Sequence, residues 1–286
     1  MDKKIDHTFE IDYPISQTIP FVFASPHSGR NYQTSFIAKS RLNLLALRRS
    51  EDSFIDDLYS DAPNYGAPFL KALFPRAYLD PNREAYELDQ EMFLEPLPDF
   101  VNTNSPRVST GLGTVPKIVA NGDEIYESKM LFKEAENRIN NCYFPYHTAL
   151  NDLIKETKNK FGKCILIDCH SMPSIGGLVN RDTKNDNVDI VLGNKHGKTC
   201  ADELIQFVEV QFKNLNLIVR RNHPYAGGYT TEHYGNPNKN VHTLQIEVNR
   251  ANYMDEKTIT RKNGFLKMKK KISNLLQALA EATFNF

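Results

Sequence analysis

The sequence predicts an α/β protein in which helices cover a largely parallel or mixed β-sheet. Short apolar runs bounded by turn residues are typical of buried strands. Amphipathic stretches with helical spacing lie between these runs, and such alternation favours a layered α/β fold. With 286 residues the chain is long enough to bury one large core, and we expect a single domain over residues 1–286.

The predicted strands are apolar and short, which suits strands buried in the middle of such a fold. They cover residues 21–24, 69–73, 78–80, 164–168, 188–192, 217–220 and 243–248.

Three stretches between the strands have the spacing of amphipathic helices. Ser50 can cap the first, which would extend to about residue 62. The second covers about residues 128–160, with a kink expected at Pro145, and the third covers about residues 256–282.

Residues 84–125 are rich in Pro, Gly, Asn and Thr and lack a strong period. We interpret this segment as a long excursion over the surface and not as a second domain. Irregular segments of that length in a compact domain are usually functional.

Composition excludes several classes of function. Acidic and basic residues number 35 each and are interleaved, so neither a nucleic-acid partner nor a membrane surface is expected. The first 14 residues carry charges where a signal peptide needs an apolar core. Four cysteines without CxxC spacing fit free thiols in a reducing cytoplasm. We expect a small-molecule substrate, and the oligomeric state stays open.

Polar residues gather at the ends of the predicted strands. His27 follows the first strand, His170 follows strand 164–168, and Glu247 lies within strand 243–248. Asn82 and Arg83 follow strand 78–80. Because ligands of open α/β sheets bind beyond the carboxyl ends of the strands, these side chains are expected to converge on one site.

Two histidines at strand ends are good zinc ligands, and a catalytic zinc takes three protein ligands. The third is expected from the stretch after Ser50. We favour Asp52 over Glu51, although spacing does not decide between them. Asp168 is expected to point away from this group and is the weaker ligand candidate; it could instead orient a neighbour. Imidazole and carboxylate also suit other divalent ions.

Other interpretations remain open. Each histidine could be an ordinary loop or core residue, and Glu247 could be a structural partner of Arg250 or Arg220. A metal-dependent phosphohydrolase could also collect such residues, although no GxxxxGK[ST] loop is present. A metal-binding or anion-binding protein without turnover is a further alternative. A serine or cysteine nucleophile is disfavoured because no GxSxG elbow occurs.

Six blocks of sequence, in this order, resemble the N-formylglutamate amidohydrolase (deformylase) family. They are SPHSGR, RRSEDSFIDDLY, FPRAYLDPNRE, DCHSMPS, HPYAGGYTTEHYG and QIEVNRANYMDE. The similarity covers roughly residues 15–285. A wider resemblance to zinc carboxypeptidases and aspartoacylase-like deacylases implies a three-layer α/β/α fold around a central mixed sheet.

This resemblance implies a metal-dependent hydrolysis of N-formyl-L-glutamate, or of a similar N-acyl amino acid, to formate and the free amino acid, as in histidine degradation. It implies His27 and His170 as ligands of one divalent ion, zinc, and Glu247 as the group that activates water. Arg76 is similar to the arginine that polarises the scissile carbonyl. The pair Asn82 and Arg83 is similar to the pair that binds the substrate carboxylate.

The carboxypeptidase pattern places its acidic ligand three residues after the first histidine, where this chain has Arg30. The ligand must therefore come from elsewhere, and Asp52 fits the resemblance better than Glu51. Gly228 would let the backbone approach the substrate closely, and Thr230 could add a polar contact.

Overall fold

A mixed β-sheet forms the centre of the computed structural model, which describes residues 7–174 and 188–286. The first six residues, part of the charged amino-terminal stretch considered above, lie outside the described residues. Within the described chain the large sheet has seven strands in the order β1-β3-β2-β4-β7-β5-β6. They are β1 (Phe9–Asp12), β2 (Phe21–Ser25), β3 (Phe69–Ala72), β4 (Cys164–Met172), β5 (Ile190–Gly193), β6 (Val219–Arg221) and β7 (Val241–Asn249).

Strands β3, β2, β4 and β7 run parallel and form the middle of the sheet. β1 pairs antiparallel with β3, and β5 pairs antiparallel with β7 while remaining parallel to β6. All nine residues of β4 and of β7 are buried, because the two longest strands lie side by side between layers of helices. The predicted mixed central sheet is therefore confirmed.

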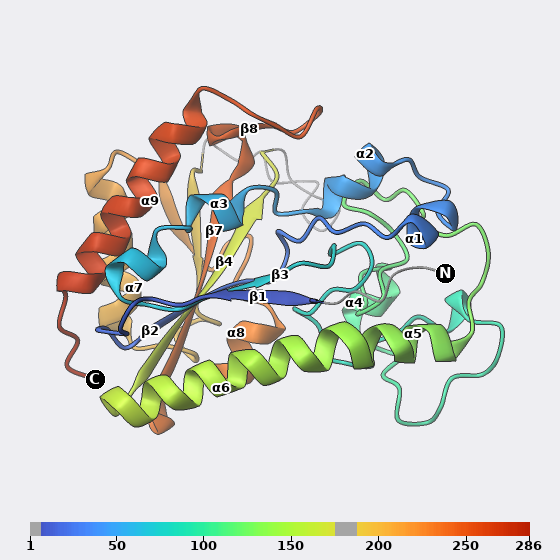
Figure 1. The fold of residues 1–286 in the computed structure, drawn as a ribbon, viewed down its shortest axis with the longest axis horizontal. Helices are drawn as coiled ribbons and strands as arrows, with labels where there is room; N and C mark the ends of the chain where they lie inside the picture. Colours follow the sequence, from blue (N-terminus) through green and yellow to red (C-terminus); the bar gives the residue numbers. More distant parts are fainter. Residues whose placement is uncertain (1–6, 175–187) are drawn as a thin grey trace.

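Helices cover both faces of this sheet, which gives the predicted three layers. In Figure 1 the long helix α6 runs along one side of the sheet, and α7 and α9 gather on the other. The first layer holds α5 (Phe132–Arg138), a π-helical turn (Ile139–Tyr143), α6 (Phe144–Phe161) and α8 (Tyr229–Tyr234). The second holds α3 (Ile55–Leu58), α7 (Asp202–Asn214) and α9 (Gly264–Glu281).

Side chains that alternate along β4 divide the core into two parts. Ile165, Ile167 and Cys169 pack against the layer of α7 and α9, whereas Leu166 packs against the layer of α6. Since alternate residues of a strand share a face, His170 lies on the same face as Leu166. The face toward α6 is thus apolar in the first half of the strand and polar in its carboxyl half.

Several predicted elements differ from the structure. Strand β1 is not among the predicted strands. Residues 78–80 form no strand, because their backbone amides bond to the carbonyls of Pro75 and Thr114. The helix expected from Ser50 is broken into short pieces, since Phe54 has a positive φ of 68°. The last helix begins only at Gly264, because β8 (Met254–Asp255) and β9 (Thr260–Arg261) pair before it.

A π-helical turn, Ile139–Tyr143, lies just before Pro145, where the sequence predicts a kink. Proline cannot donate a backbone hydrogen bond into the preceding turn, so the helix adjusts there.

Residues 84–125 contain only short helical turns, as expected, but they are not confined to the surface. Leu88, Phe93 and Val115 are buried in a small apolar cluster with Met130 and Ala135. This segment lies with the short helices beyond one end of the sheet, on the right of Figure 1. The short helices there are α1 (Thr34–Ala38), α2 (Leu44–Leu47) and α4 (Pro106–Ser109). The described chain also contains the 3₁₀ turns Arg48–Ser50, Ala62–Tyr65, Gln90–Met92, Pro237–Lys239 and Arg250–Asn252.

Over the ranges 7–174 and 188–286, helices are too short or too polar to span a bilayer.

Candidate active site

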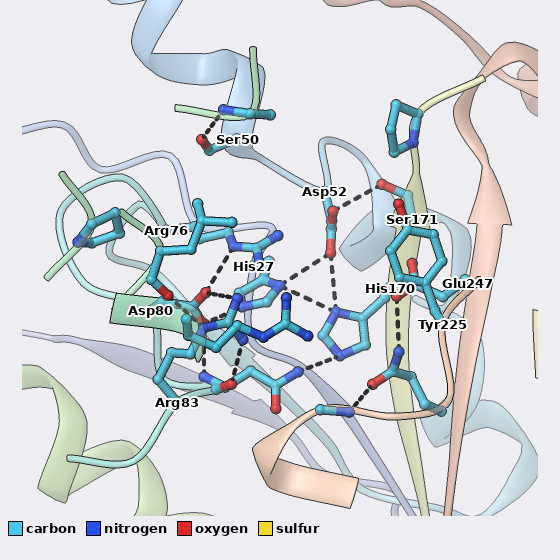
Figure 2. A pocket seen from close by; sticks show the side chains of 18 of the residues that line it. His27, Ser50, Asp52, Arg76, Asp80, Arg83, His170, Ser171, Tyr225 and Glu247 are labelled. Atoms are coloured by element: carbon cyan, nitrogen blue, oxygen red, sulfur yellow. Dashed lines mark hydrogen bonds and ion pairs between the residues drawn. The ribbon is translucent and has the colours of Figure 1, made fainter. Parts of the chain in front are cut away.

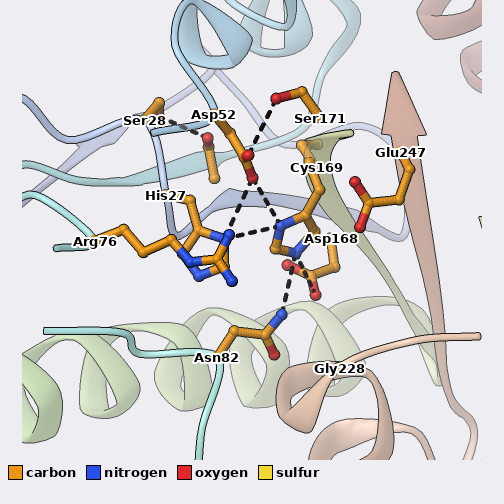
Figure 3. Close-up of polar contacts among 12 residues, drawn as sticks. His27, Ser28, Asp52, Arg76, Asn82, Asp168, Cys169, Ser171, Gly228 and Glu247 are labelled. Atoms are coloured by element: carbon orange, nitrogen blue, oxygen red, sulfur yellow. Dashed lines mark hydrogen bonds and ion pairs between the residues drawn. The ribbon is translucent and has the colours of Figure 1, made fainter. Parts of the chain in front are cut away.

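Two imidazoles and one carboxylate meet at the carboxyl edge of the sheet. The Nδ1 atoms of His27 and His170 lie 3.2 Å apart. Asp52 Oδ2 lies 3.2 Å from the first of these atoms and 3.1 Å from the second. All three side chains are buried. Figure 2 shows the three groups pointing toward one another, His170 from β4 and the other two from the loops after β2 and before α3. Figure 3 shows Glu247 on the neighbouring strand.

This triangle has the dimensions of a metal site. Zinc binds nitrogen and oxygen ligands at about 2.0–2.1 Å in tetrahedral geometry, which places neighbouring ligand atoms about 3.3 Å apart. The three donor atoms here are 3.1–3.2 Å apart, so only a small adjustment would admit an ion between them. Histidine, histidine and aspartate therefore form a group that could hold a divalent metal.

The outer nitrogen of each imidazole faces a second carboxylate. His27 Nε2 lies 2.7 Å from Asp80 Oδ1, and His170 Nε2 lies 3.0 Å from Asp168 Oδ2. Such carboxylates fix the ring orientation and raise the basicity of a metal-binding imidazole. The expectation that Asp168 points away from the site is wrong, because residues two apart on a strand share a face.

Charge interactions at the triangle favour a cation. Burial lowers the pKa of His170, but Asp168 and a hydrogen bond with Asp52 outweigh it and raise that pKa well above its usual value. Burial raises the pKa of Asp52, but hydrogen bonds from His170 and His27 and the charge of Arg250 bring it well below its usual value. The groups around the triangle therefore stabilise a positive charge placed between them. A bound metal ion would supply that charge in place of a proton, with both imidazoles neutral.

Asp52 is held by two partners besides the histidines. Its Oδ1 accepts hydrogen bonds from Ser171 Oγ at 3.0 Å and from Arg250 Nη2 at 2.9 Å. The side chain of Glu51 turns away and binds Arg48. Of the two candidates left open by the sequence, only Asp52 lies beside the histidines.

Glu247 lies directly across from His170, since these two residues are register partners on β7 and β4. It lines the same cavity, and its Oε1 accepts a hydrogen bond from Gln245 at 2.8 Å. Burial raises the pKa of Glu247 to about 7. Arg250 forms its ion pair with Asp52, and its charge opposes the effect of burial on the pKa of Glu247. The group is therefore poised to exchange a proton near neutral pH.

The opposite wall of the cavity carries arginines from the irregular segment after β3, as Figure 2 shows. Arg76 Nε donates to Asp80 Oδ2 at 3.0 Å. Arg83 Nε donates to the carbonyl of Leu112 at 2.7 Å, and its Nη1 donates to the carbonyl of Asn82 at 2.7 Å. Part of the Arg83 fork is therefore already engaged by the protein.

Asn82 lies between the metal triangle and helix α8. Its Nδ2 lies 3.3 Å from His170 Nε2, and its Oδ1 accepts from the backbone N–H of Thr230 at 2.8 Å. Thr230 is fully buried behind Asn82, whereas Gly228 lines the cavity. A Cβ on Gly228 would lie 2.3 Å from Asn82 Nδ2, so this position requires glycine.

The cavity has a volume of about 200 Å³ and joins both walls. Of the residues singled out from the sequence, it brings together His27, Asp52, Arg76, Asn82, Arg83, His170, Gly228 and Glu247. Thr230 contacts the site through Asn82, and the weaker ligand candidates Asp168 and Glu51 do not line the cavity. Residues that the sequence did not single out as part of the site also line it: Asp80, Arg107, Ser171, Tyr225, Gln245 and Arg250. The sequence could have indicated Asp80 as a site residue, because it lies two residues before Asn82 in the block FPRAYLDPNRE.

Comparisons with known proteins agree with this architecture. A family model described as N-formylglutamate amidohydrolase matches residues 19–254. The N-formylglutamate deformylase of Pseudomonas aeruginosa is 27% identical over 245 residues, covering 83% of each chain. That of Pseudomonas putida is 26% identical over 247 residues, again covering 83% of each chain.

Solved structures with the same fold include two from other bacteria. The crystal structure of N-formylglutamate amidohydrolase from Ralstonia eutropha JMP134 superposes with a TM-score of 0.88 at 32% identity, covering 96% of this chain and 97% of that one. A gene product of Agrobacterium tumefaciens superposes with a TM-score of 0.68 at 14% identity, covering 96% and 94%, which is a likeness of fold alone.

Proposed function

The chain belongs to the N-formylglutamate amidohydrolase family, and from this membership we propose that it hydrolyses the amide bond of N-formyl-L-glutamate. The products are formate and L-glutamate, and a similar N-acyl amino acid is the alternative substrate. One observation carries the proposal beyond family membership: the triangle of His27, Asp52 and His170 and the carboxylate of Glu247 line a single cavity.

We propose zinc as the ion of this triangle, because two imidazoles and one carboxylate are among its preferred catalytic ligand sets. A divalent ion held there supplies Lewis acidity, which lowers the pKa of water and polarises a carbonyl group. Asp80 and Asp168 hold the two imidazoles with their Nδ1 atoms toward that position.

Glu247 acts as the general base in this proposal. Its carboxylate removes a proton from the attacking water and later delivers that proton to the departing amine. A pKa of about 7, raised by burial, suits a group that must both accept and return a proton at neutral pH.

Arg76 stabilises the oxyanion that develops on the amide carbonyl. Its Nε is held by Asp80, and among described residues no partner takes its two terminal nitrogens, which remain for the oxyanion. Asn82 and Arg83 bind the carboxylate next to the scissile amide through their remaining N–H groups. Gly228 lets the backbone come close to the substrate at this point.

We further propose that residues 1–286 act as one domain, since both walls of the cavity belong to one continuous sheet and its connections. A cytoplasmic location and the absence of nucleic-acid partners stay predictions from composition.

Formate release by the purified protein tests the proposed reaction. Hydrolysis of N-formyl-L-glutamate is expected to stop after removal of metal with a chelator and to return with one equivalent of zinc. Phosphate release from a general phosphatase substrate would favour the phosphohydrolase instead. Bound metal without hydrolysis of any N-acyl amino acid would favour a binding protein.

Metal content tests the ligand set with a matched pair of variants. Asp52→Asn removes a charged ligand and is expected to lower the zinc bound per chain, whereas Glu51→Gln, one residue away and bound to Arg48, is expected to retain it. Equal loss of zinc in both variants would contradict the assignment of Asp52.

A further inference from the structure

Four arginines line the cavity, and three of them already have an acidic partner inside the protein. Arg76 and Arg83 contact Asp80, at 3.0 and 3.4 Å, and Arg250 contacts Asp52 at 2.9 Å. The charge of each of these guanidinium groups is therefore partly balanced before any ligand binds.

Arg107 is the exception. In the described ranges no carboxylate lies within ion-pair distance of its guanidinium, and no hydrogen bond engages that group. The residue is exposed, yet its side chain lines the cavity. An unpaired cation that lines a substrate cavity is available to an anionic group of the ligand.

The backbone that carries Arg107 is held in a fixed position. Ser105 caps the short helix α4, and its Oγ accepts the backbone N–H groups of Arg107 at 3.2 Å and Val108 at 3.1 Å. Val108 is buried and anchors the turn. The guanidinium therefore extends from a fixed base.

The chain just after this turn is bonded both to Arg107, whose carbonyl accepts the N–H of Leu112 at 2.8 Å, and to the segment that carries the proposed substrate-binding pair. Thr114 accepts the N–H of Asp80 at 2.8 Å and donates its own N–H to Glu87 at 2.8 Å. Arg83 donates to the carbonyl of Leu112 at 2.7 Å. These contacts fix the position of the Arg107 backbone relative to the site, and a preorganised backbone favours selective recognition.

The charges of the arginines also act on one another. Burial, and in addition the positive charges of Arg76 and Arg107, lower the pKa of Arg83 to about 10. An anion bound among these groups would relieve that repulsion.

We propose that Arg107 binds the side-chain carboxylate of an N-acyl acidic amino acid and thereby selects substrates with two carboxylates. This inference rests on the proposed function, in which Asn82 and Arg83 bind the other carboxylate. Arg107 is therefore a specificity-determining residue. The function of the irregular segment 84–125 in this proposal is to place Arg107 at the cavity.

The test compares N-formyl-L-glutamate with N-formyl-L-glutamine, which has the same shape and a neutral side chain. Arg107→Leu is expected to lower kcat/KM for the glutamate substrate by about 10- to 100-fold, mostly through KM, as loss of a charged hydrogen bond does. For the glutamine substrate, kcat/KM is expected to stay within about 3-fold, since no ion pair is lost. Arg107→Lys is expected to restore part of the preference, because it keeps the charge but not the planar fork.

Arg41→Leu is the matched control, because Arg41 is an exposed arginine outside the cavity and pairs with Glu124. Calorimetric titration with the product L-glutamate gives a readout without turnover, and Arg107→Leu is expected to weaken that binding where Arg41→Leu does not. A wild-type protein inactive on every N-formyl amino acid would contradict the proposed function itself. An active wild type whose preference for glutamate over glutamine survives Arg107→Leu would overturn the inference alone.

Discussion

The two walls of the cavity are built in different ways. One wall consists of the carboxyl ends of β4 and β7 and the loop after β2, which place His170, Glu247 and His27. The facing wall consists of irregular chain between residues 74 and 120, which places Arg76, Arg83 and Arg107. The strand wall carries the groups that bind metal and move protons, and the loop wall carries the groups that recognise anions.

This difference shows how the fold divides its tasks. Backbone ladders fix the strand residues to a fraction of an ångström, which suits groups that must exchange protons. The loop wall depends on side-chain hydrogen bonds, such as the one from Arg83 to Leu112, for its shape. Substitutions on the strand wall should therefore change kcat, and substitutions on the loop wall should change KM and selectivity as well.

The largest effect is expected from Glu247→Gln on the strand wall. Removal of a general base typically costs about 100- to 10,000-fold in rate. The loss should appear in kcat while zinc content stays at the wild-type level, since Glu247 is not one of the three ligand candidates. Glu281→Gln at the exposed end of α9 is the control. Retained turnover would remove Glu247 from its proposed role.

Arg76→Gln probes the loop wall where it approaches the chemistry. Loss of one donor to an oxyanion typically costs about 100- to 1,000-fold in kcat. Arg76→Lys is expected to recover only part of the rate, because a point charge does not reproduce two parallel N–H donors. If steady-state measurements showed a change in KM alone, Arg76 would bind substrate without stabilising the oxyanion. Its proposed role in the chemical step would then be wrong.

Asp80→Asn tests a residue that joins the walls, since Asp80 contacts His27 from one wall and Arg76 from the other. Loss of such an orienting carboxylate typically costs about 10- to 100-fold in metal affinity or activity. Zinc titration against a competing chelator measures the first, and kcat measures the second. Wild-type values for both would show that the orientation of His27 does not depend on Asp80.

The smallest effect is expected on stability, at His147 behind the loop wall. Its Nε2 donates to the carbonyl of Pro81 at 2.8 Å, and burial lowers the pKa of His147 to about 4. In the unfolded chain the imidazole of His147 has a pKa near 6.5, so protonation below that pH favours unfolding. The stability that depends on the neutral imidazole is therefore complete above pH 6.5 and is lost as the pH falls toward 4.

Between pH 7 and pH 5 this linkage amounts to about 2 kcal/mol in the free energy of unfolding. His147→Gln is expected to remove this part of the fall in the free energy of unfolding, as measured by urea unfolding at pH 7 and at pH 5. His196→Gln, at an exposed histidine, is the control. An identical decline in wild type and His147→Gln would assign the acid sensitivity to other groups.

Sequence patterns predicted the strand wall better than the loop wall. His27, His170 and Glu247 follow or lie in apolar runs, and period-two alternation together with the parallel order brings them to one edge. The choice between Asp52 and Glu51 could not be made from spacing, because Phe54 has a positive φ and breaks the expected helix. The direction of each side chain there depends on that local backbone.

On the loop wall, only the family resemblance indicated Arg76 and the role of Asn82 and Arg83. The sequence does not predict Arg107 as a site residue, because Arg107 lies in a segment without periodicity. Its approach to the cavity depends on hydrogen bonds between distant residues, such as that from Thr114 to Glu87. No local pattern encodes contacts of that kind. The same holds for Arg250, whose partner Asp52 lies 198 positions earlier.

The pairing of His170 with Glu247 on adjacent strands has a consequence for how substrate range can change. Backbone hydrogen bonds between β4 and β7 set their spacing, without help from the residues around the cavity mouth. The turn that carries Arg107 can therefore be exchanged or redesigned while the hydrolytic centre keeps its geometry. Relatives that accept other acyl amino acids are expected to differ first in this turn.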